Sequence, residues 1–239
     1  MKTLSAPLLV ALLVGNTRAQ SIQWMRDAGA TPFSANERGD AVDADADGNA
    51  YVLGHLSIDS QFSGSEVPAA QDGCLAKYDA VGTVQWVRTF GGPGFVDMQE
   101  TAVKVASAEN AVYVCGSFRT QFANPTITFD TIAFTFAGNS RHAFVAKYDL
   151  DGNIQWMRHG GGEGIGAGFN DLDIDAEGRI LAVGTTDGAT LFSGQNLNSA
   201  GGLLARYMPD GTLSDLVQLN DGYSEHQEAT AVEVAPGSG

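Results

Sequence analysis

The sequence is short of positive charge and of proline. It has 13 Lys and Arg against 28 Asp and Glu, a formal charge of −15, and only 7 Pro in 239 residues. Clustered Lys and Arg bind phosphate backbones and anionic membrane surfaces, so nucleic-acid and membrane-surface binding are disfavoured. Charged residues make up only 17% of the chain and apolar residues 44%, which excludes a charge-rich disordered protein. The length fits one large domain or two small ones.

Cysteine and the common catalytic motifs are nearly or wholly absent. Cys74 and Cys115 are too few for a disulfide-based scaffold, so the fold must depend on its hydrophobic core. The sequence has no H-E-x-x-H, G-x-S-x-G or C-x-x-C, the patterns of zincins, serine nucleophile elbows and dithiol sites. These absences favour a protein that is not an enzyme and predict no catalytic residue.

The first residues read as a secretory signal peptide. Lys2 gives a positive start, an apolar run covers 4–14, and small residues flank Arg18 at the cleavage positions. The run is shorter than the ~18 apolar residues of a membrane helix, and no other stretch reaches that length. The sequence therefore predicts a signal peptide at 1–19. It also predicts an exported domain at 20–239, secreted or at the surface of a bacterium, with no transmembrane segment.

Three tryptophans mark an internal repeat. Gln23-Trp24-Met25-Arg26 recurs at 85–88 and 155–158, with spacings of 62 and 70 residues, and Ser214-Asp215 is a degenerate copy. Ala-Lys-Tyr-Asp precedes the second and third copies, and Ala205-Arg206-Tyr207 precedes the degenerate one. Such self-similarity indicates one supersecondary unit per repeat.

Each repeat reads as two β-hairpins. β-prone runs at 143–148 and 153–158 flank a turn that contains Asp151-Gly152, and such turns tolerate the positive φ that a tight hairpin needs. No segment after the signal shows a helical stripe. Four antiparallel strands per repeat is the pattern of one propeller blade. The sequence therefore predicts an all-β β-propeller built from four-stranded antiparallel blades.

About three and a half repeats are present. They cover approximately 24–85, 86–155 and 156–214, with a partial repeat at 215–239. Propellers typically close with roughly four to eight blades, so the ring is predicted to be incomplete and to begin with a lone last strand at Ile22–Arg26. We therefore expect the N-terminal part of a longer exported protein, in which remaining blades or self-association close the ring.

The repeat resembles a known family. Ala-Lys-Tyr-Asp-Leu-Asp-Gly-Asn at 146–153, followed by Trp156, looks like the SBBP β-propeller repeat of exported bacterial proteins, as do 90–94 and 46–54. The resemblance covers nearly all of 22–239. It implies a multi-bladed propeller on an exported or surface protein, and the family has no common catalytic residues to carry over.

Two functions remain open. The first is a secreted or cell-surface scaffold that binds or adheres to a protein or carbohydrate ligand, which the missing catalytic motifs favour. The alternative is a propeller enzyme, a quinoprotein-like oxidoreductase or a polysaccharide-active hydrolase or lyase, with part of its site in further blades. Quinoprotein-type repeats also place Gly, Trp and Gly along a blade, and propellers host both kinds of function.

Loop lengths select a candidate binding face. Because strands alternate in direction, the short turns within hairpins share one face, and the longer connections share the other. Binding residues gather on loops that a rigid scaffold holds. The candidate ligand-binding residues on this long-loop face are Asp97, Glu100, Arg119, Arg141, His142, Glu163 and Asn170.

One candidate metal site is visible. Asp43, Asp45 and Asp47 match the opening of a calcium loop, in which alternate carboxylates converge on the cation. The ninth and twelfth positions of that loop are Tyr51 and Gly54, which supply no carboxylate. An acidic hairpin turn explains the same aspartates. The sequence thus leaves two alternatives, calcium or no cofactor.

For the remaining motifs a structural role is favoured over ligand binding. The recurring Trp and Tyr positions indicate packing between blades rather than a ligand cage. Cys74 and Cys115 align with apolar strand residues of other repeats, so free buried thiols are predicted rather than a disulfide. The glycine run at 160–168 resembles a phosphate-binding loop, but 172–175 alternates like a strand, which favours a connection between blades.

Overall fold

The computed structural model describes residues 22–29, 37–56, 61–62, 65–66, 73–92, 96–120, 126–135, 140–162, 166–219 and 227–235. These residues form antiparallel strands, turns and one short 3₁₀ helix, Ser107–Glu109, with no α-helix among them. The protein is therefore all-β, as predicted. The predicted signal peptide lies outside the described residues, and no helix within them is long and apolar enough to cross a membrane.

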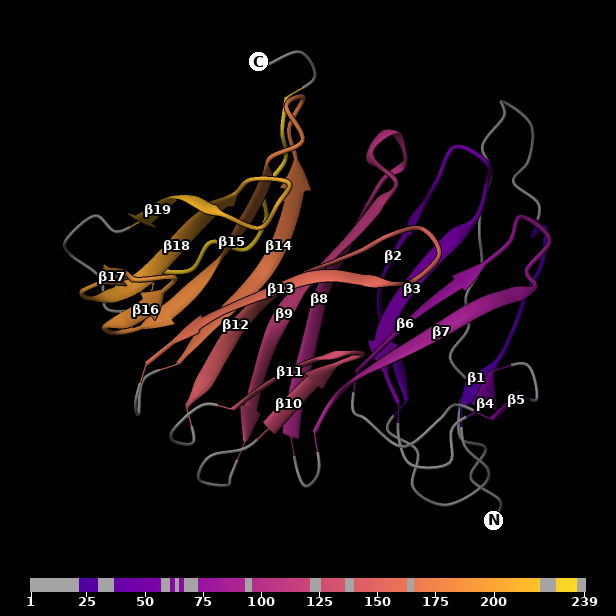
Figure 1. Ribbon diagram of the computed structural model, residues 1–239, viewed down its shortest axis with the longest axis horizontal. Coiled ribbons are helices and arrows are strands. Elements are labelled where there is room, and N and C mark those ends of the chain that lie inside the picture. The colour runs from indigo at the N-terminus through magenta and orange to yellow at the C-terminus, as the bar shows by residue number, and fades with distance from the viewer. Residues whose placement is uncertain are drawn as a thin grey trace.

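Three of the four sheets in the described residues stand side by side (Figure 1). The first contains β2 (Arg38–Ala44), β3 (Ala50–His55), β6 (Gly73–Tyr78) and β7 (Val84–Gly91). The second contains β8 (Val96–Ala106), β9 (Ala111–Thr120), β12 (Arg141–Tyr148) and β13 (Ile154–Gly161). The third contains β14 (Ala167–Ile174), β15 (Ile180–Asp187), β18 (Ala200–Tyr207) and β19 (Leu213–Leu219). In each sheet these four strands pair in chain order, and no sheet closes on itself.

A short hairpin links each sheet to the one before it. β10 (Thr126–Phe129) and β11 (Ile132–Thr135) lie between β9 and β12 in the chain, yet β10 pairs with β7 of the first sheet. β16 (Thr190–Phe192) and β17 (Gln195–Leu197) lie between β15 and β18, yet β16 pairs with β13 of the second sheet. β4 (Gln61–Phe62) and β5 (Ser65–Glu66) lie between β3 and β6 in the chain and form a separate three-stranded sheet with β1 (Ala28–Gly29), in which β4 pairs with β1. We call these three units staple hairpins.

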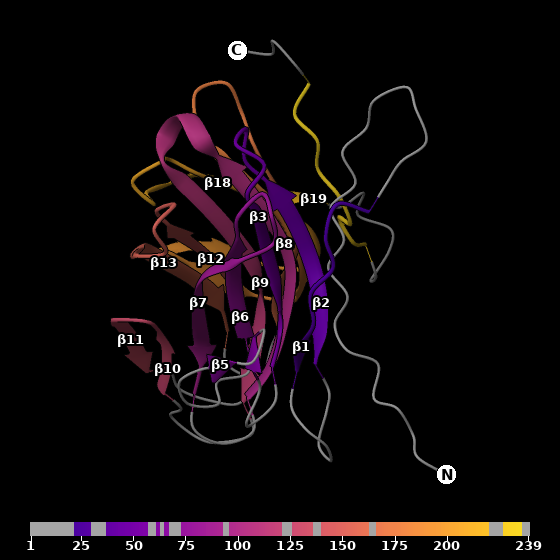
Figure 2. The ribbon, with the colours of Figure 1, turned by 90° about the vertical axis from the view of Figure 1, so that its right-hand side faces the viewer.

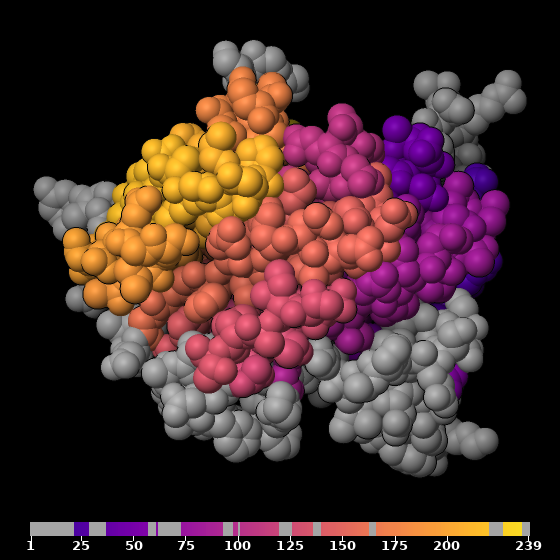
Figure 3. All heavy atoms as spheres, viewed as in Figure 1, coloured from indigo at the N-terminus to yellow at the C-terminus, as the bar shows by residue number. Residues whose placement is uncertain are grey.

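The staple hairpins pair at equivalent positions. Phe62, Phe129 and Phe192 lie opposite Ala28, Phe90 and Gly160 in the three ladders. Phe129 and Phe192 are fully buried. The Phe129 ring stacks on Phe90 with centroids 4.9 Å apart, and a β-carbon on Gly160 would collide with the Phe192 ring. The β10–β11 hairpin lies beside β7 in a second view (Figure 2) and forms one continuous surface with the neighbouring strands (Figure 3).

The repeated tryptophans hold a turn of the next sheet. Trp86 Nε1 and Lys77 Nζ both donate to Leu150 O, at 3.1 and 3.0 Å, and Arg88 Nε donates to Gly152 O at 2.6 Å. Gly152 has a φ of +82° and lies against the Trp86 ring, where a β-carbon would come within 2.8 Å of Cδ2. We call this group of Lys, Trp and Arg the turn latch. It confirms that the recurring tryptophan packs between repeats.

The turn latch recurs between the second and third sheets. Trp156 Nε1 and Lys147 Nζ donate to Pro209 O, at 3.0 and 3.1 Å, and Arg158 Nε donates to Gly211 O at 2.9 Å. An incomplete copy stands before the first sheet. There Arg26 Nη2 donates to Val81 O at 3.2 Å, and the Trp24 ring lies against Gly82. Trp24 Nε1 is buried without a hydrogen-bond partner among the described residues.

The hydrophobic core lies between the sheets. Tyr51, Leu53 and Leu75 of the first sheet pack in one cluster with Val114 and Phe144 of the second. A second cluster joins Tyr113, Cys115 and Val145 to Ile180, Ala182 and Leu203 of the third sheet. Cys74 and Cys115 are buried and are not joined in a disulfide, as predicted.

The two ends of the described chain differ. Val234 N donates to Asp173 Oδ2 at 2.7 Å, just as Val105 N of β8 donates to Asp43 Oδ2 of β2 at 2.7 Å. Val234 therefore stands toward β14 as Val105 of β8 stands toward β2, although residues 227–235 pair in no ladder. The strand expected at Ile22–Arg26 is not formed: Arg26 takes part only in an isolated bridge, and the ladder lies at Ala28–Gly29.

Replacing Gly152 with Ala should destabilise the protein by about 2 to 4 kcal/mol. The new methyl group adds left-handed backbone strain, about 1 to 2 kcal/mol, and displaces the Trp86 ring from the turn. Gly194→Ala is the matched control, because Gly194 has a φ of +86° and nothing within 4 Å of the added carbon. Urea unfolding should show a clearly larger loss at Gly152. Equal losses at the two glycines would contradict the packing role of the turn latch.

Candidate functional site

The described residues that were predicted on the long-loop face lie in strands rather than in loops. Asp97 and Glu100 are in β8, Arg119 in β9, Arg141 and His142 in β12, and Asn170 in β14. The expectation that they lie in loops is therefore wrong, because the β8–β9 ladder continues as far as Val96 and Thr120. Glu163 lies outside the described residues.

Three of these positions form one row across the second sheet, which we call the arginine row. Arg141 is the ladder partner of Arg119, and Arg119 is the ladder partner of Asp97. Directly opposed residues in an antiparallel pair share a face, with Cβ atoms ~4.5–5.5 Å apart. The structure thus brings two guanidinium-bearing positions and one carboxylate-bearing position together. Arg119 is exposed, and Arg141 is half-buried.

Arg141 bridges the second and third sheets. Its Nε donates to Ala167 O and its Nη2 donates to Thr185 Oγ1, both at 3.4 Å. The guanidinium also lies against Gly168, where an added β-carbon would collide with it. A guanidinium has five N–H donors, so it can hold both sheets and still bind an anion.

Asn170 and Glu100 lie away from the arginine row. The Asn170 amide donates to Glu228 Oε1 at 2.9 Å and to Ala229 O at 3.0 Å, so it fastens the 227–235 segment to β14. Glu100 is the ladder partner of Gly116, three residues along β8 from Asp97. Neither residue belongs to the arginine row.

His142 belongs to a buried aromatic cluster. Its ring stacks on Phe118 with centroids 5.5 Å apart and an interplanar angle of 1°. His159 stacks on Phe134 of the β10–β11 staple hairpin at 4.5 Å, and the two imidazoles are 5.5 Å apart. Burial and the neighbouring His159 lower the pKa of His142 to about 4, and burial lowers the pKa of His159. Both rings are therefore neutral at pH 7.

Ser140 was not singled out in the sequence and lies next to His142. Ser140 Oγ and His142 Nε2 are 3.2 Å apart, within the range of a nucleophile and its base. The two residues are only 5% and 7% exposed, and Phe118 covers the imidazole ring. A substrate therefore has no access to this pair, and the contact contributes to packing.

The three aspartates of the candidate calcium loop do not converge. Asp43 accepts a hydrogen bond from Val105 N in the next sheet. Asp45 accepts bonds from Asn49 Nδ2 at 2.8 Å, from Tyr51 OH at 3.2 Å and from the amides of Asp47 and Asn49. Burial raises the pKa of Asp45, but these donors outweigh it and hold that pKa below its usual value.

The same turn cap recurs along the chain. In four turns an aspartate Oδ1 accepts from the backbone amides two and four residues later, namely at Asp45, Asp79, Asp149 and Asp175. This is the Asx-turn geometry that Asp supports in tight turns. Within the described residues no group of three or more His, Cys, Asp and Glu is placed to hold a metal ion.

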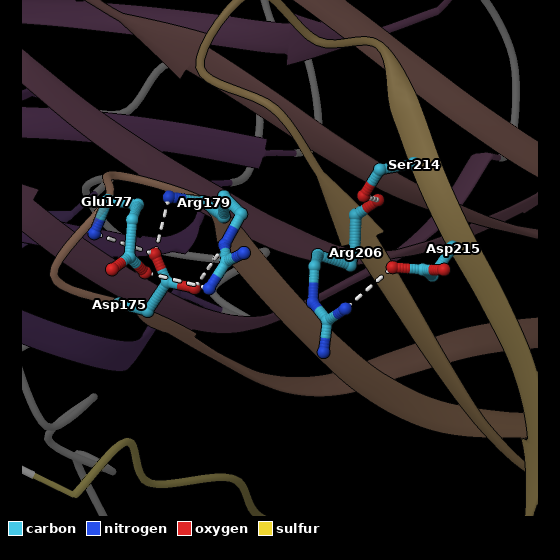
Figure 4. Close-up of polar contacts among 6 residues, drawn as sticks. All are labelled: Asp175, Glu177, Arg179, Arg206, Ser214 and Asp215. Atoms are coloured by element: carbon cyan, nitrogen blue, oxygen red, sulfur yellow. Dashed lines mark hydrogen bonds and ion pairs between the residues drawn. The ribbon is translucent and has the colours of Figure 1, made fainter. Parts of the chain in front are cut away.

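The third sheet lacks the turn latch. The ladder pairs Lys77–Trp86 and Lys147–Trp156 correspond to Arg206–Asp215 in the third sheet. Arg206 Nη1 forms an ion pair with Asp215 Oδ2 at 2.6 Å, and Ser214 Oγ donates to Arg206 O (Figure 4). Nearby, Arg179 pairs with Asp175 at 2.6 Å and with Glu177 at 2.7 Å. In the third sheet the Arg206–Asp215 ion pair thus stands at the position where the latch lysine and tryptophan of the other sheets hold a turn of the following sheet.

Comparison with known proteins identifies no family. No family model matches the chain, and a search of curated proteins found no significant match. Resemblance to the SBBP repeat therefore stays a prediction from the motifs, and the function must be argued from the geometry.

Acid should destabilise the protein through His142. The folded state holds the His142 pKa at about 4 against an ordinary value of 6.5, so the unfolded chain takes up the proton first as the pH falls. Stability is then constant above pH ~6.5 and is lost between pH ~6.5 and ~4, by at most about 3 kcal/mol. Urea unfolding between pH 7.5 and 4 measures this loss. His142→Phe should reduce this loss and leave the part due to His159, whose pKa is also lowered by burial, and an unchanged slope in that variant would contradict the assignment.

Calcium and magnesium should give equal, small heats in titration calorimetry. Asp45 already accepts four hydrogen bonds, and Asp43 is committed to the next sheet. Asp45→Asn should lower stability by about 1 kcal/mol through the turn and leave both heats unchanged. A calcium-specific heat that disappears in Asp45→Asn would instead establish a site at Asp43, Asp45 and Asp47.

Proposed function

We propose that the protein is a secreted or cell-surface β-propeller scaffold of the SBBP type. Its role is to bind a ligand rather than to catalyse a reaction. The observation that carries this proposal is the turn latch, because the repeated Lys, Trp and Arg side chains are engaged in joining one sheet to the next. The repeated aspartates are likewise engaged in turn caps. The repeated polar and aromatic side chains thus hold the sheets and turns in place, which is the role expected of them in a binding scaffold.

The arrangement of the sheets supports a propeller. Three equivalent four-stranded antiparallel units follow one another, and their first strands β2, β8 and β14 are neighbours. Each unit meets the next through the same face, with the same latch and the same staple hairpin. Repeating one such step produces an arc of blades, and Val232 and Val234 lie against β14 as Val105 of β8 lies against β2.

The arginine row supports a ligand that carries a carboxylate. Arg119 and Arg141 are ladder partners at one end of the second sheet, in a chain with a formal charge of −15. Guanidinium groups bind carboxylates bidentately and remain charged at all working pH values. We propose this row as the binding position for an acidic group of a protein or carbohydrate ligand.

Affinity electrophoresis through gels that contain polygalacturonate or polyglutamate tests this function. We expect the protein to be retarded by at least one of these carboxylate polymers and not by dextran. Arg119→Gln should reduce the retardation several-fold, whereas Arg179→Gln, the same charge change on the third sheet, should leave it unchanged. No retardation by either polymer, or equal effects of both variants, would overturn the proposal.

A further inference from the structure

We propose that the outer edge of β19 is a docking site for a phenylalanine-bearing β-hairpin from another polypeptide. The inference does not depend on the ligand of the arginine row. It begins from the staple hairpins, which extend the edges of β1, β7 and β13 at one shared position. β19 is the fourth strand of the third sheet, as β7 and β13 are of theirs. Within the described part of the chain no strand pairs with its outer edge.

Leu219 marks the docking position on β19. In the ladders with the third strand of each sheet, Phe90 is opposite Gly73, Gly160 is opposite Ala143, and Leu219 is opposite Gly202. Phe90 and Gly160 are each covered by the phenylalanine of a staple hairpin. The equivalent Leu219 is 41% exposed, and Val217 beside it is 44% exposed. An open edge with exposed apolar side chains is the surface to which an added strand binds.

The face behind this edge argues against a complete further sheet of the same kind. Asp215 stands where Trp86 and Trp156 stand, and Val217 stands where Arg88 and Arg158 stand. These residues supply no indole N–H, no ring for a turn glycine and no guanidinium for its carbonyl. A second copy of the first sheet would also meet residues 227–235, which already lie against β14.

The hairpins already present define what the edge accepts. Phe129 and Phe192 are completely buried, and each belongs to a tight turn with positive φ, at Asp130 in one and at Ser193 and Gly194 in the other. Only two residues of each hairpin pair with the preceding sheet. Burial of the phenylalanine therefore supplies most of the specificity, and the backbone pairing sets the register. The partner is a hairpin with Phe directly before a Ser-Gly or Asp-Thr turn.

A peptide copy of the chain's own hairpin is the probe. A fluorescently labelled peptide of residues 187–199, mixed with the full chain, should give a saturable rise in anisotropy. A peptide with the Phe192→Ala change should bind about tenfold or more weakly, because it lacks the apolar ring that the bound hairpin buries. Hydrogen exchange should show that the wild-type peptide protects the amides of 216–219.

Two protein variants localise the binding. Leu219→Asp should abolish peptide binding, and Val81→Asp, which changes an exposed apolar residue in a distant turn, should leave it intact. Binding that survives Leu219→Asp, or that is equal for both peptides, would overturn the proposal. Protection at 160–161 would mean exchange with β16–β17 and would also overturn it. Dimerisation that Leu219→Asp removes would assign the edge to a second copy and contradict the proposed partner.

Discussion

One backbone carbonyl, shared by an indole N–H and a lysine ammonium, fixes how each sheet meets the next. Leu150 O and Pro209 O accept both donors, and an arginine holds the glycine carbonyl two residues later. Because the turn glycine has positive φ and lies flat on the indole, no side chain separates the two sheets there. The latch fixes the distance and the relative orientation of two neighbouring sheets at the end where their hairpin turns lie. The other contacts between the sheets have to be compatible with that arrangement.

Two other contacts complete the step from sheet to sheet. On the first strands of the sheets, Asp43 of β2 accepts the Val105 amide of β8, and Asp173 of β14 accepts the Val234 amide. Lys104 of β8 also pairs with Asp173 at 3.4 Å. At the opposite end, a staple hairpin covers the preceding sheet with a buried phenylalanine. Acidic side chains therefore have structural roles in this protein. Part of the high negative charge is bound into turns and sheet contacts.

Local patterns predicted the units of the fold. The Trp spacing, the Asp-Gly turns and the alignment of Cys74 and Cys115 with apolar positions depend on neighbours in sequence or on the repeat, and the structure has the same four-stranded units and buried thiols. The degenerate copy at Ser214-Asp215 lies in the sheet that lacks the latch.

Non-local pairing explains what the sequence did not predict. The staple hairpins pair with a sheet from the preceding repeat, so their segments had no local partner and were interpreted as loops. The recurrence of Phe-Ser-Gly at 62–64 and 192–194 was the available signal. For the same reason the sequence predicted loop positions for Arg119, Arg141 and His142, which the structure has in strands. The stacking of His142 on Phe118 depends on ladder register, which the composition of the segment does not reveal.

Hydrogen exchange on a latch variant tests the central claim most directly. Trp156→Phe keeps a ring over Gly211 but removes the N–H that donates to Pro209 O. If each sheet is held through its own latch, protection should fall by about tenfold in the 208–212 turn and in β18 and β19, while β2 and β3 keep theirs. A uniform loss across all three sheets, or no change near 208–212, would contradict the account.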